Sequence, residues 1–346
     1  TGDCGTGYCA STDWGNDIRT TEESFAAYIQ LNWSGDISGM PANLRAGVRY
    51  EETDVTSAAK SVLYNQTMWL APGEEVIVLP AEDADGNPLQ GFEDITASYD
   101  LLLPSIDFDI EFIENVVARA SYSETITRPN YNDIKGGLSV SGRVQYRTNT
   151  APGATAGNPG LVPIQSENID LSLEWYYADD SYFSVGYFEK DVKNFIGTGF
   201  EETPIFDIPN VIGGQLWEDA KTAAGLTDTD YGEIGNYIIN NYADNAAVDT
   251  SVTPAQIYGQ DGDPALVWVL SRPVNQKAAE VDGIEINLQH TFGDTGYGFV
   301  ANATFANANI GYDIANPLEG QFVLNGLSDS ANLIAFYDKN DLQVRL

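Results

Sequence analysis

The sequence predicts an all-β fold, a transmembrane antiparallel up-and-down β-barrel segment of about ten strands with long loops on one side. Ten segments alternate apolar and polar residues, and side chains on a strand point to opposite faces, so each segment has one apolar and one polar face. The connections are alternately short and long, as in a membrane barrel with tight turns at one rim and large loops at the other. These two observations predict the fold class.

The predicted strands span residues 20–33, 43–53, 97–110, 116–127, 166–177, 181–195, 277–292, 296–309, 328–337 and 341–346. Short connections at 34–42, 111–115, 178–180, 293–295 and 338–340 contain turn residues such as Asp179 and Asp180. The predicted extracellular loops are residues 1–19, 54–96, 128–165, 196–276 and 310–327. All long connections would therefore leave from the same rim.

Each strand can be assigned its faces in order. The apolar positions of the first, second and third strands include Phe25, Ile29, Leu31, Leu44, Val48, Leu102, Ile106 and Phe108. Those of the fifth, seventh and eighth include Leu171, Leu173, Trp175, Ile284, Ile286, Leu288, Phe299 and Phe305. The opposite faces carry charges such as Arg45, Asp107 and Glu174, which could not lie unpaired in a dry core. A water-filled lumen accommodates them, whereas a soluble antiparallel sandwich, the alternative, does not explain the loop asymmetry.

Aromatic residues gather near the short turns, where a membrane–water boundary would lie. They are Trp33, Phe108, Trp175, Tyr177, Phe292 and Tyr297. The only histidine, His290, falls on the apolar face of its strand, and we interpret it as an interfacial residue and not a metal ligand.

The composition excludes several classes of protein. The 16 basic and 51 acidic residues give a net charge of −35, which would repel nucleic-acid phosphates. No apolar run approaches the roughly 18 residues of a spanning helix. No nucleophile elbow or phosphate-binding loop is present, so we predict no catalytic residues and no enzymatic activity. The acidity itself could serve ligand selection or a salty habitat.

Two sets of residues suggest local binding or cross-linking chemistry. Cys4 and Cys9 lie close together in a Gly-rich loop, and we predict a small disulfide ring in an oxidising, cell-exterior environment. Asp83 and Asp85, and likewise Asp261 and Asp263, form oxygen-rich turns that are weak candidates for Ca²⁺, although ordinary Asp-Gly turns explain them better. No other cofactor or metal is predicted.

The loop at 196–276 is too long to lack structure of its own. We predict a helix at 215–225, a second helix capped by Thr229 and a third opening at Thr253-Pro254. Exposed aromatic rings beside Asp and Asn suit sugar rings, although most such rings will pack beneath a loop. The ligand-binding candidates are Trp69, Trp217, Tyr237, Tyr242, Tyr258 and Trp268.

Several motifs resemble those of TonB-dependent outer-membrane receptors, nearest to a proteobacterial subgroup linked with oligosaccharide uptake. They are Gly157-Asn158-Pro159-Gly160-Leu161-Val162-Pro163 with the following Ser166 to Trp175, the Arg128-Pro129 step, Gly283-Ile284-Glu285, and the hairpin region from Gly326 to Leu346. The resemblance implies a barrel of about 22 strands in the outer membrane of a Gram-negative bacterium, a plug in its lumen and energy supplied by the TonB complex.

The plug, the energy-coupling box and the terminal aromatic strand are not among residues 1–346, so we expect this chain to be the middle and later part of such a barrel. Loop 196–276 has twelve acidic residues against Lys221 and Arg272, which should disfavour anionic ferric siderophores. We therefore predict a receptor for a neutral oligosaccharide. The alternatives are a siderophore or metal-chelate receptor and a structural or adhesive surface barrel.

Overall fold

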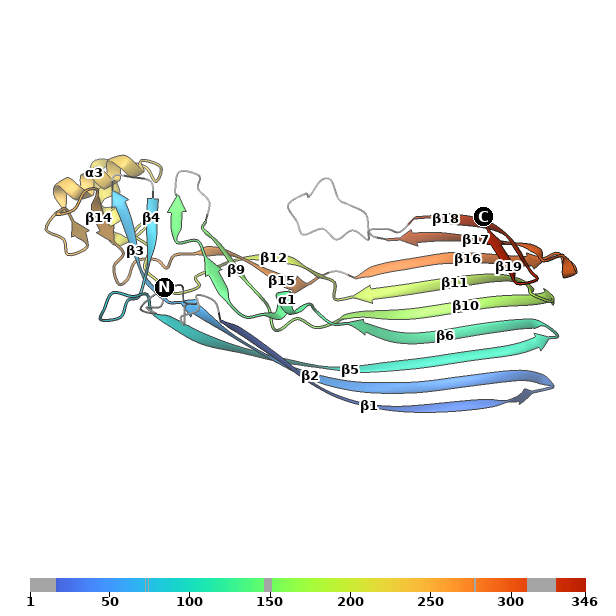
Figure 1. Cartoon of the computed structure of the whole chain (residues 1–346). Helices are drawn as coiled ribbons and strands as arrows, with labels where there is room; N and C mark the ends of the chain where they lie inside the picture. The colour runs from blue at the N-terminus through green and yellow to red at the C-terminus, as the bar shows by residue number, and fades with distance from the viewer. Residues whose placement is uncertain (1–16, 72, 74, 146–150, 277, 310–327) are drawn as a thin grey trace, which may run out of the picture.

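The computed structural model describes residues 17–71, 73, 75–145, 151–276, 278–309 and 328–346. Ten strands form one antiparallel sheet in which each strand pairs with the next along the meander (Figure 1). In spatial order they are β1 (Ile18–Ile37), β2 (Met40–Val62), β5 (Gln90–Ile113), β6 (Val116–Thr127), β10 (Ile164–Ala178), β11 (Ser181–Lys193), β16 (Ala279–Thr291), β17 (Tyr297–Ala308), β18 (Ser330–Lys339) and β19 (Leu342–Arg345). All ten predicted strands are confirmed. The prediction for Cys4, Cys9 and loop 310–327 lies outside the described residues.

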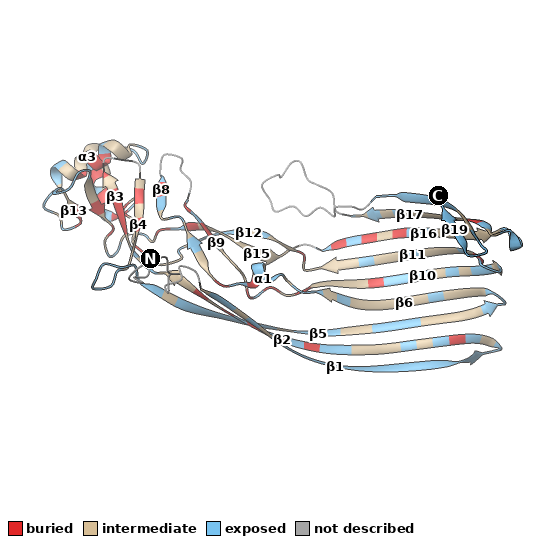
Figure 2. Ribbon diagram, viewed as in Figure 1, coloured by how far each residue is buried: buried red, intermediate tan, exposed pale blue. Residues whose placement is uncertain are grey.

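The apolar face of the sheet is exposed, as the barrel prediction requires. Ile284 is 46% exposed and Leu102 is 60% exposed, so no second protein layer in the described chain covers this face. Figure 2 shows the same contrast: buried residues concentrate near the long loops, and most of the sheet is exposed or intermediate. A face of this kind is stable when hydrocarbon, not water, lies against it.

Tight turns join the strands at one end, which we call the turn end; the opposite end is the loop end (Figure 1). Ser38 and Gly39 have φ of 56° and 87°, and Asn340 and Asp341 have φ of 53° and 61°. Two positive φ angles in a two-residue connection match the type I′ turn, whose twist suits a hairpin. The short connections are therefore at the predicted rim.

The aromatic residues near the turn end form a contacting cluster. The Tyr177 hydroxyl lies 3.1 Å from Nδ1 of His290, and the two rings stack with centroids 5.9 Å apart. Phe292 and Phe299 complete the group, with ring centroids 4.8 Å and 5.9 Å from the imidazole. Rings of this kind favour the boundary between hydrocarbon and water.

The paired strands β2 and β5 extend further towards the loop end than predicted. β2 was expected to end at residue 53 but runs to Val62, and β5 begins at Gln90, not residue 97. On β2, the apolar face becomes acidic after Tyr50, and the alternation of apolar and polar residues that predicts a strand stops there. The pairing of β2 with β5 nevertheless continues as far as Val62, which lies opposite Gln90. Strand pairing, not hydrophobic periodicity, therefore determines this length.

In the parts of the long loops that the structure describes, two smaller sheets and three helices form. One sheet pairs β12 (Ile196–Thr203), β15 (Trp268–Asn275), β9 (Gly153–Ala156) and β7 (Leu138–Val140). The other pairs β13 (Val248–Asp249), β14 (Ala255–Tyr258), β3 (Tyr64–Ala71), β4 (Glu75–Pro80) and β8 (Arg143–Gln145). The helices are α1 (Tyr131–Ile134), α2 (Gln215–Ala224) and α3 (Tyr231–Asn241), and a 3₁₀ turn, η2 (Gly293–Thr295), lies at the turn end.

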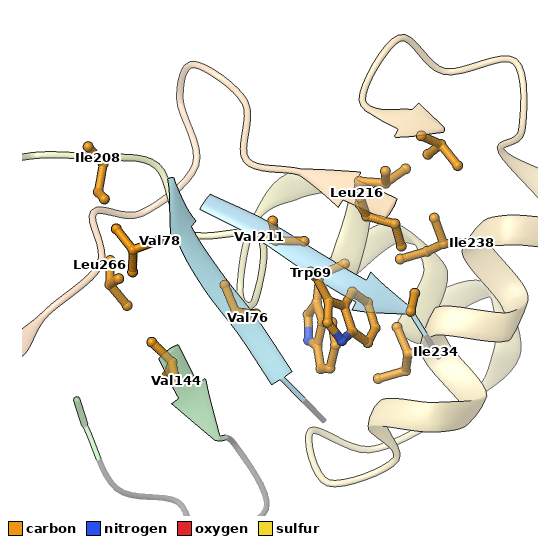
Figure 3. Close-up of a cluster of buried hydrophobic side chains, with 14 of the residues drawn as sticks. Trp69, Val76, Val78, Val144, Ile208, Val211, Leu216, Ile234, Ile238 and Leu266 are labelled. Carbon is orange, nitrogen blue, oxygen red and sulfur yellow. The ribbon is translucent and has the colours of Figure 1, made fainter. Parts of the chain in front are cut away.

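We use the name cap for the second small sheet together with α2 and α3. Its core contains Trp69, Val76, Trp217, Ile234, Ile238 and Ile257, each at most 1% exposed (Figure 3). The cap joins segments that are far apart in the chain, because β14 pairs with β3, placing Ile257 opposite Trp69. It therefore folds as one small body beyond the loop end of the sheet (Figure 1).

The helix predictions in the cap are right in part. The helix at 215–225 is confirmed as α2, and the second is confirmed as α3, but its N-cap residue is Asp230 and not Thr229, and the Asp230 carboxylate accepts the Thr227 amide of the preceding turn. The third predicted helix is wrong: residues 255–258 form β14. Pairing with β3 determines this conformation, and sequence-local capping could not reveal it. No helix in the described ranges is both long and apolar enough to cross a membrane.

Candidate functional site

The structure buries the three tryptophans that were predicted to bind ligand in one hydrophobic core: Trp69 and Trp217 belong to the cap, and Trp268 begins β15 of the other small sheet. The expectation that these three rings are exposed to a ligand is therefore wrong. Trp69 and Trp268 are 0% exposed and Trp217 is 1% exposed. Trp69 packs on Trp217 with ring centroids 5.3 Å apart and donates its indole N–H to the Gly73 carbonyl at 2.7 Å. Large apolar rings contribute most when fully removed from water, which explains why these indoles face inward.

The three tyrosine candidates are half-buried and do not form one site. Tyr237 of α3 and Tyr242, the residue directly after this helix, lie together with ring centroids 6.3 Å apart. Tyr258 is on β14, and its hydroxyl donates to Gln256 Oε1 at 2.6 Å. Tyr237 and Tyr242 therefore stay candidates for ligand contact.

The carboxylates considered for Ca²⁺ make hydrogen bonds within their own turns. Asp83 Oδ1 accepts the amides of Asp85 and Asn87, each at 2.9 Å, and these bonds, led by the Asn87 amide, lower the pKa of Asp83. Asp263 accepts the Gln215 amide at 2.9 Å and so stabilises the N-terminus of α2. Within the described part of the chain, no three His, Cys, Asp or Glu residues are grouped so that they could hold a metal ion.

The Asp230 carboxylate organises the turn that precedes α3. Its Oδ2 accepts the Thr227 amide at 2.8 Å and the Thr227 hydroxyl at 2.7 Å, and the amide bond is the main cause of its lowered pKa. A depressed folded-state pKa means that this stabilisation is complete above the unfolded value of roughly 3.9 and is lost as pH falls through the folded value.

We expect amide hydrogen exchange at Thr227 to accelerate as the pH is lowered below about 4, after correction for intrinsic exchange. The Asp230→Asn variant should lack this pH-dependent step, because its side chain does not titrate. Equal pH profiles for the two proteins would contradict the assignment.

The segment after β6 folds back onto the polar face of β2 at the loop end. We call residues 128–145 and 151–163 the tucked segment. Ile134 and Leu161 pack against Val55, and all three are at most 2% exposed. The Gly136 amide also donates to Ser57 Oγ. The part of the polar face at the loop end is therefore covered by protein and does not line open water.

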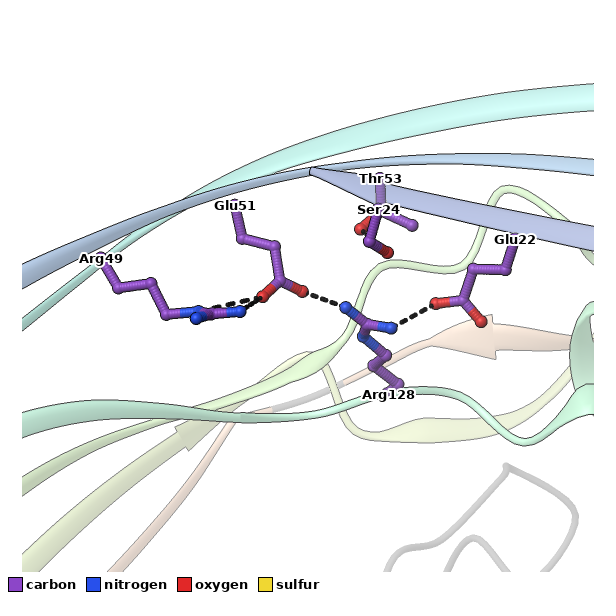
Figure 4. Close-up of polar contacts among 6 residues, drawn as sticks. All are labelled: Glu22, Ser24, Arg49, Glu51, Thr53 and Arg128. Atoms are coloured by element: carbon purple, nitrogen blue, oxygen red, sulfur yellow. Dashed lines mark hydrogen bonds and ion pairs between the residues drawn. The ribbon is translucent and has the colours of Figure 1, made fainter. Parts of the chain in front are cut away.

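A clamp of four charged residues fixes the beginning of the tucked segment (Figure 4). Arg128 Nη1 lies 3.1 Å from Glu22 Oε1, and its Nη2 donates to Glu51 Oε1. Arg49 Nη2 donates to Glu51 Oε2 at 2.8 Å. Glu51 is only 3% exposed, so the two guanidinium groups compensate the cost of burying its charge. The clamp thus joins β1, β2 and the end of β6.

The Gly-Asn-Pro motif ties the other end of the tucked segment to β15. The Asn158 amide donates to the Asp133 carbonyl at 2.7 Å, and its side chain donates to the Pro273 carbonyl at 2.9 Å. Glycine is required at position 157, directly before Asn158, because a Cβ there would overlap the Lys135 carbonyl oxygen. The motif is therefore a packing element of the loop end.

We expect Gly157→Ala to destabilise the protein by about 1–3 kcal/mol, because the added methyl group has no room. Thermal unfolding of the purified protein measures the loss. The matched control is Gly142→Ala, where an added Cβ meets no atom within 4 Å. A Gly157→Ala protein as stable as the control would refute the packing role.

A cavity of about 330 Å³ opens beside the clamp, and its lining brings polar and apolar groups together. It is lined by Thr127, Arg128, Pro129, Asn130, Asp133, Ile164, Ile196, Gly197, Thr198 and Pro273. These side chains offer a guanidinium donor, a carboxylate acceptor, an amide and two hydroxyls within an apolar frame. Such a combination binds and orients a small polar ligand.

The open part of the polar face lies nearer the turn end and carries a second cavity of about 570 Å³. Arg45, Asp107, Asp109, Arg119 and Asp170 are among its lining residues. Arg119 pairs with Glu174 at 3.0 Å. This charged wall confirms the predicted separation of faces.

Sequence reasoning missed the residues at the centre of the loop end. Arg128-Pro129 was recognised only as a family motif, and its partners Glu22 and Glu51 were not identified. Only a weak sequence signal pointed to this ion-pair cluster. Glu22 and Glu51 lie on the polar faces of two neighbouring strands, near the positions where the apolar faces of those strands end.

Comparison with known proteins gives one match over nearly the whole chain. The family model described as TonB dependent receptor-like, beta-barrel matches residues 5–341. No curated protein matches the chain.

Solved structures with a similar arrangement include three receptors. A mutant of the ferric enterobactin receptor PfeA of Pseudomonas aeruginosa is 15% identical, with a TM-score of 0.44 over 94% of this chain and 41% of that one. The ferric-catecholate import receptor Fiu of E. coli is 14% identical, with a TM-score of 0.46 over 94% of this chain and 33% of its own. The siderophore receptor PirA of Acinetobacter baumannii is 14% identical, with a TM-score of 0.45 over 94% and 42%. The chain thus spans between a third and about two fifths of the length of these receptors.

Proposed function

The chain belongs to the TonB-dependent receptor-like β-barrel family, and from this premise we propose that it forms the ligand-capturing half of an outer-membrane import receptor. The family match over residues 5–341 carries the proposal. The exposed apolar face supports it, since this face suits a bilayer, and the polar face opposite suits a lumen. Import would be driven by the TonB complex acting on a plug within the completed barrel.

We propose that the ligand contacts the receptor at the 330 Å³ cavity beside Arg128 and, separately, at the surface of the cap. Arg128, Asn130 and Asp133 supply donors and acceptors in the cavity, and Tyr237 with Tyr242 offers aromatic faces at α3. The charged clamp holds this region in place before the ligand arrives, which lowers the entropy cost of binding.

For the ligand, we propose a metal chelate without net negative charge in first place and a neutral oligosaccharide in second. Burial of Trp69, Trp217 and Trp268 removes three of the six aromatic rings that were proposed to stack on a sugar, which weakens the oligosaccharide prediction. The excess of acidic residues in loop 196–276 opposes an anionic ligand. A ferric ion held by three hydroxamates is neutral, whereas one held by three catecholates carries three negative charges.

Calorimetry of the complete receptor tests this order of ligands. We expect the neutral ferric trihydroxamate to bind about tenfold or more tightly than the ferric tricatecholate, and a neutral gluco-oligosaccharide to bind more weakly than the trihydroxamate. Asn130→Ala should weaken chelate binding, while the control Asn236→Ala, on the exposed side of α3, should not. Binding of the oligosaccharide alone would reverse our ranking.

The same receptor reconstituted with its TonB complex distinguishes transport from adhesion. A structural or adhesive barrel would bind partners through its loops without moving a solute. Uptake of radioactive iron that stops when the TonB complex is removed supports the import role. Iron accumulation that does not depend on that complex would contradict it.

A further inference from the structure

The small sheet of β12, β15, β9 and β7 has one covered face and one exposed face. The covered face packs against the hydrophobic core and includes Leu138, Val140, Ala154 and Leu270. The strand register places a second row of residues on the opposite face, namely Phe200, Ser271, Thr155 and Ser139. The Phe200 ring is 64% exposed. One aromatic ring therefore stands among hydroxyl groups on this surface, which we call the Phe200 face.

The Phe200 face is continuous with the cavity of about 330 Å³ beside the clamp. Thr198 and Pro273, which line the cavity, form the strand pair next to Phe200 and Ser271 on the same face. Two residues along a strand span about 7 Å, so the ring lies close to the cavity lining. A single exposed ring is common on protein surfaces. A ring in this position, however, contacts any ligand that extends out of the cavity along β12.

Glu202 lies on the same face beyond the ring, about 7 Å further along β12 and opposite Val269. Its side chain is exposed, and no ion pair involves it within the described ranges. The neighbouring Glu201 points to the other face and pairs with Arg272 at 3.1 Å. The protein therefore compensates the charge of Glu201, whereas the charge of Glu202 is left for a ligand.

These features fit a long chelate with a positive end. The cavity is at the small end of the range of about 300–1,000 Å³ that is usual for ligand pockets, so a long ligand extends beyond it. Apolar linkers between hydroxamates suit the Phe200 ring, and amide groups in the same chain suit the hydroxyls of Thr198 and Ser271. A terminal ammonium would meet the complementary charge of Glu202 and contact the ring face.

We propose that the Phe200 face is a subsite for the arm of a linear ferric trihydroxamate, with a terminal ammonium beside Glu202. The subsite rests on the proposed function, because it takes binding of the chelate in the cavity as given. It adds a preference within that class of ligand: a chelate with a free cationic arm binds better than a neutral or a cyclic one.

Calorimetry of the complete receptor with three ferric trihydroxamates tests the subsite. Ferrioxamine B ends in an ammonium, its N-acetyl derivative has the same chain without the charge, and the cyclic ferrioxamine E has no free arm. Ferrioxamine B should bind about fivefold more tightly than its N-acetyl derivative at low salt. The advantage should shrink as salt is raised, because exposed charges are screened. Equal affinities of these two chelates at low salt would overturn the proposal.

Two neighbouring carboxylates provide a matched pair of variants. Glu202→Gln should remove the advantage of ferrioxamine B over its N-acetyl derivative. Glu201→Gln changes the next residue, on the opposite face of the same strand, and should preserve that advantage. An advantage that persists in Glu202→Gln, or that is lost equally in both variants, would refute the role of Glu202.

Variants of Phe200 test the contact with the arm. Phe200→Ala should weaken binding of both linear chelates about fivefold and leave the affinity for ferrioxamine E unchanged, whereas Phe200→Tyr should retain the wild-type affinities. Equal weakening for all three chelates would contradict a contact with the arm. Thermal unfolding first shows whether each variant is folded. The comparison of chelates on the wild-type protein needs no variant, so it decides the matter even where a substitution impairs folding.

The same measurements separate the two levels of the proposal. Wild-type protein that binds all three chelates alike would remove the subsite and leave the proposed function intact. Wild-type protein that binds none of the three would contradict the proposed ligand class and the subsite with it.

Discussion

Replacing Trp217 by alanine is expected to unfold the cap while leaving the ten-stranded sheet intact. The indole is 1% exposed and contacts Trp69 and Tyr231, with ring centroids 5.3 Å and 5.4 Å away. Truncating a fully buried tryptophan costs about 3–5 kcal/mol, since the transfer energy is lost and a cavity remains. A body as small as the cap has little stability to spare.

Limited digestion with trypsin measures this loss. Lys221 lies in α2 with a side chain 19% exposed, so its cleavage requires local opening of the cap. Cleavage after Lys221 should accelerate strongly in Trp217→Ala, and cleavage after Arg19 of β1, outside the cap and with a side chain that is 68% exposed, should change less. The control Phe200→Ala removes an aromatic ring that is 64% exposed and should cost less than about 0.5 kcal/mol. Protection of Lys221 in Trp217→Ala would show that the core is organised differently.

Replacing Arg128 by methionine is expected to release the tucked segment from β1 and β2. The change leaves Glu22 without this ion pair, and Glu51 keeps only Arg49. Removing one partner of a buried pair costs several kcal/mol, and the 40% exposure of Arg128 reduces this to about 2–3 kcal/mol. Hydrogen exchange at residues 131–140 should become faster, because their amides lose the protection of the closed segment.

Two further variants identify the cause. Arg143→Met removes an exposed pair with Glu75, whose atoms are 3.2 Å apart, and should cost at most about 1 kcal/mol. Adding Glu51→Gln to Arg128→Met should recover part of the loss, because the buried charge is then gone. A double variant less stable than Arg128→Met alone would contradict the idea that the clamp compensates the cost of burying the Glu51 charge.

The strands could be predicted because their pattern is local. Ile284, Ile286 and Leu288 alternate with Glu285 and Asn287, and the pleat of a strand converts this alternation directly into two faces. Turn residues such as Ser38-Gly39 fix the hairpins with equally local backbone preferences. The family motifs extended this interpretation to membrane location and receptor class.

The predictions about the binding site were wrong where contacts between distant segments of the chain decide which residues are buried. An exposed tryptophan and a buried one look alike in sequence, and only the pairing of β3 with β14 shows that Trp69 is covered. The ion pair of Arg128 with Glu51 bridges 77 residues, and no periodicity reports such a distance. The helix predicted after Thr253 became a strand for the same reason.

By itself, the sequence determined the ten strands, their two faces, the rim that carries the turns and the family of the chain. These properties follow from the period of side chains along a strand and from the turns between neighbours. The tertiary structure alone decided which aromatic rings are covered, where the tucked segment lies and which charges meet in the clamp. Those outcomes depend on loops that bring remote residues together, and burial and ion pairing are properties of the folded neighbourhood and not of the residue.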